Sequence, residues 1–549
     1  MLQVSRAAAT YDAIVVGSGA TGGWAAKELT EAGMRVALLE AGKPVTPKDF
    51  NEHTQSWQLK YLGLDPTIRE TRPIQGQCYA CTEHNYKWFV NDKENPYTQE
   101  KPFNWIRQRV VGGRSLSWGR QSYRMSDLDF KAASHDGYGD DWPISYAEMV
   151  PYYEKVERYV GISGMEEGLP QLPDSIFLPP MEMTCSEWKV RNAIKAKFDR
   201  TLTIGRTAIL TRSHNGRAAC HYCGPCERGC VTYSYFSSPF TTIKDAQSTG
   251  RLTLITDAAA SRVIVQDGKA VGVEYVDAAS NRTREVRAKL VMLCASTLES
   301  TRLMMNSGIG GGNDALGKYL MDHIYQGGAS GIMPDPETKA WAGMPRRPNG
   351  IYIPRFRNVK EKQTNGFIRG YGYQGGGMPV FNYGAPGFGK DFKDAVHKSR
   401  YAMQIGLWGE CLPRKENHVT IDQDKKDVHG IPVLKISASW GDNEMKLWED
   451  GREQAVEMLT AAGVQEVRKT GERPSVFGFC IHEVGTARMG TDAKTSVLNK
   501  YNQMWDVPNV FCTDGAAWVT VGCQNPTLTM MAITVRACDY IKREYAKTL

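Results

Sequence analysis

Long apolar runs are missing from this chain, and their absence excludes one broad class of protein. No apolar stretch approaches the roughly 20 residues that a helix needs to cross a bilayer, and the mean hydropathy is −0.43. Blocks of like charge are missing too, although the net charge is +7 and the pI is about 8.6. Scattered charge is typical of a solvated surface, so we expect neither a transmembrane segment nor a nucleic-acid partner.

The N-terminal segment lacks the features of an export signal. "MLQVSRAAATYDAIVVGSG" has one arginine and no apolar core before its first expected strand, unlike a Sec or twin-arginine signal. Taken alone, this predicts a cytoplasmic location. Internal repeats are absent as well, and 549 residues, 41% of them hydrophobic, suffice for two or more structural units around a buried core.

The segment "YDAIVVGSGATGGWAAKELTEAGMRVALLEAG" is typical of a dinucleotide-binding fold. An apolar strand at 13–16 is followed by a glycine turn, a helix over 23–33 and a second strand that ends in Glu40. The turn contains Gly17, Gly19 and Gly22. These glycines permit a tight turn, close approach to a pyrophosphate and close helix packing, and Glu40 can accept a ribose hydroxyl. The pattern predicts dinucleotide binding without separating FAD from NAD.

A second informative segment lies near the C-terminus. "NVFCTDGAAWVTVGCQNPTLTMMAITVRACDYI" contains a short strand, then Asp514 and Gly515, then a loop and a helix that begins near Pro526. Motifs near both ends of the chain suggest one cofactor held by both. Flavoproteins of similar shape commonly hold their cofactor in this way, with the late aspartate and a helix N-terminus on the flavin half.

Six ordered motifs resemble the glucose–methanol–choline (GMC) oxidoreductases. They are "GSGATG" at 17–22, "RVVGGRSLSWGR" at 109–120, "LGKYLMDHI" at 316–324, "ECLPRKENHVTID" at 410–422, "HEVGTARMG" at 482–490 and "TDGAAW…NPTLT" at 513–529. The resemblance implies FAD, a hydroxyl donor and an α/β with α+β fold. A Rossmann-like FAD-binding domain is expected beside a discontinuous substrate domain on a mostly antiparallel sheet. The expected FAD-binding parts are 1–144, 216–324 (with the cysteine loop 220–230) and 478–549, and the substrate parts are 145–215 and 325–477.

The resemblance also implies site residues. His482 matches the catalytic histidine, and Asn525 stands where the family has a second catalytic histidine or asparagine. A neutral histidine can take the hydroxyl proton while the carbon hydride goes to flavin, and an asparagine can hold the hydroxyl oxygen. His323 is expected to be structural. The expected cofactor contacts are Gly17, Gly19, Ala20, Thr21, Gly22, Glu40, Ala41, Arg109, Gly112, Gly113, Ser115, Trp118, Gly119, Val263, Asp514, Gly515, Asn525, Pro526 and Thr527.

Four of the thirteen cysteines lie within the eleven residues "CHYCGPCERGC", namely Cys220, Cys223, Cys226 and Cys230. Their C-x2-C-x2-C-x3-C spacing equals the ferredoxin run, except that Val231 replaces the usual proline. The spacing predicts an iron–sulfur cluster, 3Fe-4S or 4Fe-4S, on these thiolates. A structural zinc or thiol loop and disulfides are the alternatives. Because the proline is missing, the pattern supports Cys230 least. Cys78 and Cys81 form another C-x2-C pair. A loop pair or buried thiols is expected, and an approach to the cluster is the alternative.

The overall pattern resembles the bacterial FAD-dependent sugar dehydrogenases of the family, especially glucoside 3-dehydrogenases. This implies oxidation of a secondary pyranose or glucoside hydroxyl, at C3, to a 3-keto sugar. It also implies a small subunit carrying a twin-arginine signal, a c-type cytochrome acceptor and a periplasmic location by co-export. The predicted cluster favours a dehydrogenase. An oxygen-using GMC sugar or alcohol oxidase with a structural cysteine loop stays open, as does a non-catalytic electron-transfer flavoprotein.

Aromatic side chains in the expected substrate domain are candidates for stacking on a sugar ring. They are Trp341, Trp408, Tyr371, Tyr373, Phe381 and Tyr383. For any single one of them, an ordinary loop or core aromatic is the expected alternative.

Overall fold

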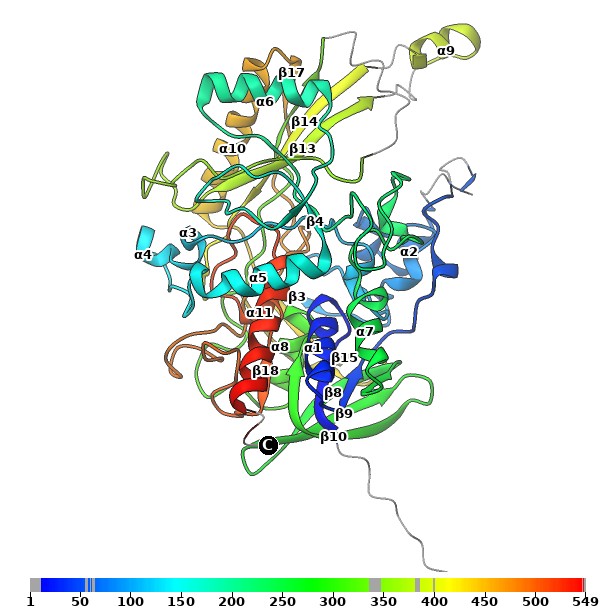
Figure 1. Ribbon diagram of the computed structural model, residues 1–549, viewed down its shortest axis with the longest axis vertical. Coiled ribbons are helices and arrows are strands. Elements are labelled where there is room, and N and C mark those ends of the chain that lie inside the picture. Colours follow the sequence, from blue (N-terminus) through cyan, green and yellow to red (C-terminus); the bar gives the residue numbers. More distant parts are fainter. Residues whose placement is uncertain are drawn as a thin grey trace, which may run out of the picture.

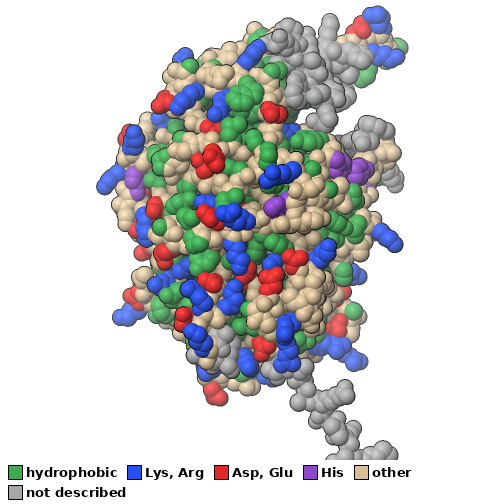
Figure 2. Space-filling view, viewed as in Figure 1, with side chains coloured by type: hydrophobic (Ala, Val, Ile, Leu, Met, Phe, Trp, Pro, Cys, Tyr) green, Lys and Arg blue, Asp and Glu red, His purple; other side chains and the backbone are tan. Residues whose placement is uncertain are grey.

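The computed structural model describes residues 11–54, 58–59, 61, 65–334, 347–380, 386–397, 400–545 and 547. Figure 1 shows an elongated molecule with one large sheet in its lower part and another in its upper part. None of the helices in the described ranges combines the length and the apolar character needed to cross a membrane. Positive and negative side chains are interspersed on the face shown in Figure 2, as the scattered charges of the sequence predict.

The lower sheet has seven strands in the order β7-β2-β1-β10-β9-β8, with β18 also paired to β10. They are β1 (Tyr11–Val16), β2 (Val36–Leu39), β7 (Leu252–Ile255), β8 (Ala258–Gln266), β9 (Lys269–Asp277), β10 (Arg282–Leu293) and β18 (Val510–Cys512). β7, β2, β1, β10 and β18 pair in parallel, and β8 and β9 extend the sheet as an antiparallel hairpin. β1 and β2 are continuous apolar runs because helices cover a parallel sheet on both faces.

Helices pack around this sheet and around one another. α1 (Ala20–Glu31) contacts α7 (Thr242–Ser248) and α11 (Thr527–Tyr540), and α11 also contacts α5 (Tyr146–Val160). α8 (Thr297–Asn306) lies against β8. Figure 1 shows the first and last long helices, α1 and α11, side by side, so the two ends of the chain meet in one layer.

The upper sheet has six antiparallel strands in the order β17-β11-β14-β13-β12-β6. They are β6 (Thr203–Ile204), β11 (Gly328–Ile332), β12 (Ile351–Ile353), β13 (Tyr371–Val380), β14 (Arg400–Gly409) and β17 (Gln465–Thr470). α10 (Asp442–Ala461) contacts β11, β14 and β17, and α6 (Cys185–Phe198) contacts α10 and β13.

Smaller elements connect these layers. The short strands are β3 (Thr98–Gln99), β4 (Ile162–Ser163), β5 (Phe177–Leu178), β15 (His418–Lys426) and β16 (Pro432–Ser437). The short helices are α2 (Ile68–Thr71), α3 (Asp127–Phe130), α4 (Ala132–Asp136) and α9 (Gly389–His397). Single helical turns are η1 (Pro47–Asp49), η3 (Gln75–Gln77), η4 (Tyr86–Trp88), η5 (Gly113–Leu116), η6 (Cys226–Arg228), η7 (Ser238–Phe240), η9 (Gly515–Ala517) and η10 (Ile541–Tyr545).

The expected fold class is confirmed: a mixed, largely parallel nucleotide sheet lies beside a six-stranded antiparallel sheet. β1 and β2 occur where the sequence predicts them. α1 begins at Ala20, three residues before the expected helix, because the glycine turn itself forms its first turn. The exact domain boundaries stay predictions.

Two of the sugar-contact candidates are ordinary core aromatics, the alternative expected for any single one of them. Tyr371 and Tyr373 on β13 are fully buried in the core of the upper sheet, where their rings pack against each other and against Phe356. Their position as core residues removes them from any binding surface. Trp341, Phe381 and Tyr383 lie outside the described residues.

Candidate active site

A cavity of about 710 Å³ lies where the carboxyl ends of the parallel strands meet the upper sheet. Its lining combines the β1–α1 turn, the loop 106–121, the residues after β10, the segment 479–483 and the start of α11. Cavities of about 300–1,000 Å³ are typical of small-molecule and cofactor sites. Both ends of the chain therefore contribute to one site, as the sequence predicts.

The glycine turn forms one end of the cavity. Gly17 has φ +95°, a left-handed conformation that favours glycine, and its N–H donates to Leu39 O at 2.8 Å. α1 has Gly19 as its N-cap without a side-chain cap, so its first backbone N–H groups are available to a ligand in the cavity. An uncapped helix N-terminus of this kind favours a phosphate.

Glu40 lies beside this turn at the end of β2. Ser18 Oγ donates to its Oε2 at 2.5 Å, and Gly42 N donates to its Oε1 at 2.8 Å. Burial raises the pKa of Glu40, although these hydrogen bonds oppose the shift. The carboxyl lines the cavity, in the position expected of a ribose hydroxyl acceptor.

The loop 112–118 is tied to the glycine turn through serines. Gly112 N donates to Ser18 Oγ at 2.9 Å, and Ser238 Oγ donates to Ser18 O at 2.7 Å. Ser115 Oγ donates to Gly112 O at 2.7 Å. The loop that the resemblance places along the flavin is therefore fixed to the same turn that would hold the phosphates.

The C-terminal segment closes the opposite end. Asp514 caps η9 by accepting Ala516 N, and Ser300 Oγ donates to Asp514 Oδ2 at 2.5 Å. α11 has Pro526 as its N-cap with no side-chain cap, and Thr527 at its start lines the cavity. Two helix N-termini, those of α1 and α11, thus contribute to one cavity. These features fit FAD, whose pyrophosphate and electron-rich flavin edge both favour positive helix ends.

Most of the expected cofactor contacts line this cavity. Those that do are Gly17, Gly19, Ala20, Thr21, Glu40, Ala41, Arg109, Gly113, Ser115, Trp118, Gly119, Asp514, Gly515, Asn525, Pro526 and Thr527. Gly22, Gly112 and Val263 do not line it. On β8 the lining residues are Ala258–Ala260, whereas Val263 N donates to Ser307 Oγ at 2.8 Å and its side chain is buried in the core.

His482, the expected base, projects into the cavity and contacts a second histidine. His482 Nδ1 lies 3.0 Å from His323 Nδ1, and His323 Nε2 lies 3.0 Å from Gly522 O. Burial lowers the pKa of His323 to about 4, so this ring is neutral and carries one N–H. Because the Gly522 carbonyl can only accept, that N–H is on Nε2. His323 Nδ1 then accepts the Nδ1–H of His482, which leaves a lone pair on His482 Nε2.

Asn525 faces this lone pair. Asn525 Nδ2 lies 3.3 Å from His482 Nε2, and Gln374 Nε2 on β13 donates to Asn525 Oδ1 at 2.7 Å. The glutamine therefore orients the amide so that its N–H group points toward the histidine. An acceptor nitrogen and a donor amide converge on one point of the cavity.

The surroundings keep His482 neutral. Burial lowers its pKa well below the ordinary histidine value, and His323 and Arg114 act in the same direction. Asp322 accepts the backbone N–H of His482 at 3.0 Å. Burial and the charge of Glu483 raise the pKa of Asp322 to about 8, so at neutral pH it places little negative charge beside the ring.

Three candidate functional residues were not predicted as functional from the sequence. His323 was expected to be structural, yet it sets the tautomer of His482, and Gln374 and Cys480 line the same part of the cavity. The "MDHI" motif marks His323 in the sequence, but its contact with His482 spans 159 residues. For Gln374 the sequence carries no such signal. Trp408 lines the cavity, as a sugar-contact candidate should.

The cysteine loop lies next to this cavity, and its four thiols are close enough to act on one another electrostatically. Cys220, Cys226 and Cys230 pack in one apolar cluster with Tyr235, whereas Cys223 lies outside it. Cys226 and Arg120 couple electrostatically, and Arg120 also lines the cavity.

All thirteen cysteines are free in this structure, and no three of the four loop sulfurs lie within 4.8 Å of one another in the described ranges. The described positions of these sulfurs therefore contain neither a disulfide nor a ready-made tetrathiolate group. Cys78 and Cys81 are buried, as expected.

Comparisons with known proteins agree with this geometry. The family profile described as "GMC oxidoreductase" matches residues 11–325 with its N-terminal part and residues 413–534 with its C-terminal part. A 2-methyl-1,2-propanediol dehydrogenase of Mycolicibacterium austroafricanum is 31% identical over 97% of this chain and 96% of its own. The fructose dehydrogenase large subunit of Gluconobacter japonicus is 24% identical over 98% of this chain and 99% of its own. A solved structure of Aspergillus oryzae formate oxidase matches with a TM-score of 0.64 and 14% identity, over 99% of this chain and 100% of its own. This match shows that the two chains share a fold.

The glycine turn generates the first prediction. A Cβ on Gly22 would lie 1.7 Å from Gly17 O, whereas a Cβ on Gly19 would meet nothing within 4 Å. In apoprotein, Gly22→Ala should therefore lower the free energy of unfolding by about 1–3 kcal/mol, and Gly19→Ala should leave it unchanged. Gly19→Ala should instead lower the amount of FAD bound per chain, because the new methyl group would enter the part of the cavity expected to hold the pyrophosphate. Thermal unfolding and flavin absorbance measure the two effects, and equal stability of both apo variants would contradict the assignment.

The lowered pKa of His482 generates the second. The reactive form is neutral, and its pKa lies below the ordinary value, so activity is lost only as pH falls through that lowered pKa. kcat/KM should therefore stay constant between about pH 7.5 and 6, where an ordinary histidine with pKa near 6.5 would become protonated. Initial rates across this range test the expectation. An acidic limb centred at or above about pH 6.5 would show that the base is not a buried, neutral His482.

Proposed function

The chain belongs to the GMC oxidoreductase family, and on this premise we propose that it is a dehydrogenase for a polyhydroxylated substrate. The family is FAD-dependent and acts on the CH–OH groups of alcohols and sugars. The substrate we propose is a pyranose or glucoside whose secondary hydroxyl, at C3, becomes a ketone. His482 takes the hydroxyl proton.

One observation carries this proposal: His482 Nε2 offers a lone pair at 3.3 Å from the Asn525 amide N–H. A substrate hydroxyl placed beside both nitrogens, on the cavity side, would donate its hydrogen to His482 and accept a hydrogen bond from Asn525. The oxygen is then held in place while its proton leaves, which is what oxidation of an alcohol requires of the protein. FAD, when bound, supplies the hydride acceptor.

The residues that surround His482 support exclusion of water and orientation of the ring. Phe479, Trp408 and Tyr325 line the same part of the cavity and are largely apolar. The backbone amides of Cys480 and His482 donate to Asp322, which fixes the segment that carries the base. A dry, fixed site strengthens each hydrogen bond to the reacting hydroxyl.

A second cavity supports a substrate with several hydroxyl groups. It measures about 650 Å³ and shares Tyr325, Gln326, Gln374 and Trp408 with the first cavity. Beyond these it is lined by polar groups such as Gln404, Glu472 and Arg473. Amides and charges can bind hydroxyls, and the two aromatic rings can stack on the apolar face of a pyranose. A simple monohydric alcohol would use little of this surface.

We infer further that the cysteine loop holds an iron–sulfur cluster. Its spacing and the shared apolar pocket of Cys220, Cys226 and Cys230 support the inference. When bound, such a cluster supplies a one-electron acceptor next to the cofactor cavity. This arrangement favours an external protein acceptor, such as a c-type cytochrome, over oxygen.

We also propose a small partner subunit that carries a twin-arginine signal, with a periplasmic location by co-export. The similarity to a relative named as a large subunit supports a multi-subunit enzyme. Purification from the native cell, with identification of co-purifying chains and comparison of periplasmic and cytoplasmic fractions, tests both statements.

The third prediction concerns the reaction. Purified holoenzyme under nitrogen should oxidise glucosides with an artificial acceptor, and NMR should identify a 3-keto product. His482→Ala should lower kcat by about 10²–10⁴-fold, because a general base contributes that much. The control His135→Ala changes a histidine that does not line the cavity and should leave kcat unchanged.

A panel of sugars, glucosides, vicinal diols and simple alcohols separates the alternatives. Preference for a vicinal diol such as 2-methyl-1,2-propanediol would replace the sugar assignment while keeping the role of His482. Stoichiometric peroxide in air, without turnover of the artificial acceptor, would establish the oxidase alternative. Loss of less than a few-fold in kcat for His482→Ala would contradict the assigned base.

The fourth prediction concerns the cluster. Protein purified without oxygen should contain iron and acid-labile sulfide, and Cys226→Ala should lose both. Cys81→Ala is the matched control, because Cys81 is also buried in a C-x2-C pair but belongs to another apolar cluster. Protein that oxidises its substrate normally without iron or sulfide would contradict the proposed electron path.

A further inference from the structure

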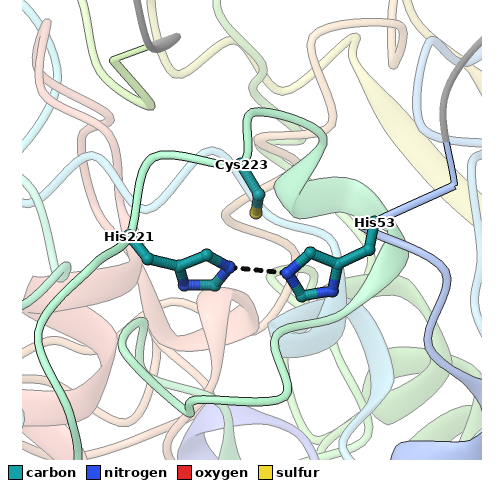
Figure 3. A group of neighbouring side chains, drawn as sticks. All are labelled: His53, His221 and Cys223. Carbon is teal, nitrogen blue, oxygen red and sulfur yellow. Dashed lines mark hydrogen bonds between the residues drawn. The ribbon is translucent and has the colours of Figure 1, made fainter.

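Two histidines meet the one cysteine of the loop that lies outside its apolar cluster. His53, His221 and Cys223 each offer a ligand atom, and all these atoms lie within 4.8 Å of one another (Figure 3). His53 Nε2 and His221 Nε2 are 2.8 Å apart, with ring centroids 5.0 Å apart and an interplanar angle of 21°. Figure 3 shows the sulfur of Cys223 directed toward the gap between the two rings. The described part of the chain has one other such group, His323, Cys480 and His482, which belongs to the active site.

The chain holds this group in place from outside it. Asn51 N donates to Arg228 O at 3.1 Å, and Arg228 Nη1 donates to Thr54 O at 3.0 Å. A Cβ on Gly229, which has φ +107°, would lie 2.2 Å from the ring of Phe50. The segment 50–54 and the cysteine loop are therefore packed and hydrogen-bonded together. His53 reaches the loop because both of its flanks are attached to it.

A buried carboxylate stands behind the histidines. Glu52 is 2% exposed, and its Oε1 accepts Val231 N at 2.6 Å. The same oxygen lies 3.9 Å from His53 Nδ1, the ring nitrogen that faces away from His221. Histidines that bind metals commonly place their second nitrogen toward a carboxylate, which fixes the ring and strengthens the ligand. The arrangement has this form, with a small movement left to complete the contact.

We propose that His53, His221 and Cys223 bind one divalent transition-metal ion of the zinc type. Two imidazole nitrogens and one thiolate are ligands that Zn²⁺ prefers, and the exposed histidine side leaves a fourth position for water. In a tetrahedral site with Zn–N bonds of about 2.0–2.1 Å, the nitrogens lie roughly 3.3 Å apart. The two rings need to separate by about half an ångström from their present contact, which their exposed side chains permit.

This site is distinct from the proposed iron–sulfur cluster. Cys220, Cys226 and Cys230 remain together in their own apolar cluster, enough for a three-cysteine 3Fe-4S centre, while Cys223 serves the histidines. The bound ion would join the segment 50–54 to the loop and so clip the N-terminal part of the chain to the cysteine region. The proposal depends neither on the substrate nor on the electron acceptor.

Cobalt titration of chelator-treated holoenzyme tests the site, because Co²⁺ occupies zinc sites and reports a thiolate ligand by its absorption. We expect one Co²⁺ per chain with thiolate-to-cobalt absorption that Cys223→Ser abolishes. His53→Gln and His221→Gln should each weaken binding by more than about 100-fold, since even outer partners such as Glu52 contribute about 10–100-fold. His214→Gln, in a partly exposed loop outside the group, is the matched control and should bind like the wild type.

Flavin content and thermal unfolding of each chelator-treated variant show whether it is folded. Zn²⁺ should raise the unfolding temperature of the wild type but not that of His53→Gln. Unchanged cobalt binding in all three ligand variants would overturn the proposal. Loss of iron and sulfide together with cobalt binding in His53→Gln would also overturn it, because the histidines would then serve the cluster. Retention of cobalt binding in Cys226→Ser supports two separate sites.

Discussion

The arrangement of the site depends on one hydrogen bond between the buried His323 and the partly buried His482. His323 Nδ1 can accept the Nδ1–H of His482 only while His323 is neutral, and desolvation lowers the pKa of both rings. The Gly522 carbonyl fixes the proton on the far nitrogen of His323, so the direction of the chain of hydrogen bonds is set from outside the cavity. The base therefore presents its lone pair before any substrate arrives. This is preorganisation in the sense that the energetic cost of orienting the ring is met by folding.

The same bond explains why distant parts of the chain must assemble together. His323 ends the segment that follows α8, His482 precedes η9, and Gly522 lies between η9 and α11. The parallel pairing of β1, β10 and β18 places the residues after each strand at one edge of the sheet, which brings the glycine turn and Asp514 to a common cavity. Gln374 adds the upper sheet to this assembly through Asn525. The glycine turn, His482 and the upper-sheet residue Gln374 thus depend on the same set of long-range contacts.

Local patterns were predictable from the sequence, and long-range contacts were not. The glycine turn was predictable because it is formed by residues that are neighbours in the sequence. The GMC motifs identified His482 and Asn525, and both line the cavity. Tyr371 and Tyr373 could be read as surface aromatics because glycines surround them. Those glycines instead allow close strand packing: a Cβ on Gly375 would lie 2.0 Å from Gln404 O. The spacing of the cysteines gives their positions in the sequence but not in space, so it could not show that Cys223 lies outside the apolar cluster of the other three. Nor could it reveal the contact of His221 with His53, which is 168 residues away.

The cysteine region can vary independently of the catalytic site because the two share little structure. Gly224 and Gly229 adopt left-handed conformations with φ +106° and +107°, so the turns of the loop are set by the backbone. Hydrogen bonds from the segment 50–54 hold the loop without any bound ion. Arg120 connects this region to the cofactor cavity, because its side chain lines the cavity and its charge interacts with Cys226 of the loop. The loop is therefore held by contacts of its own, separate from the hydrogen bonds that fix His482 and Asn525.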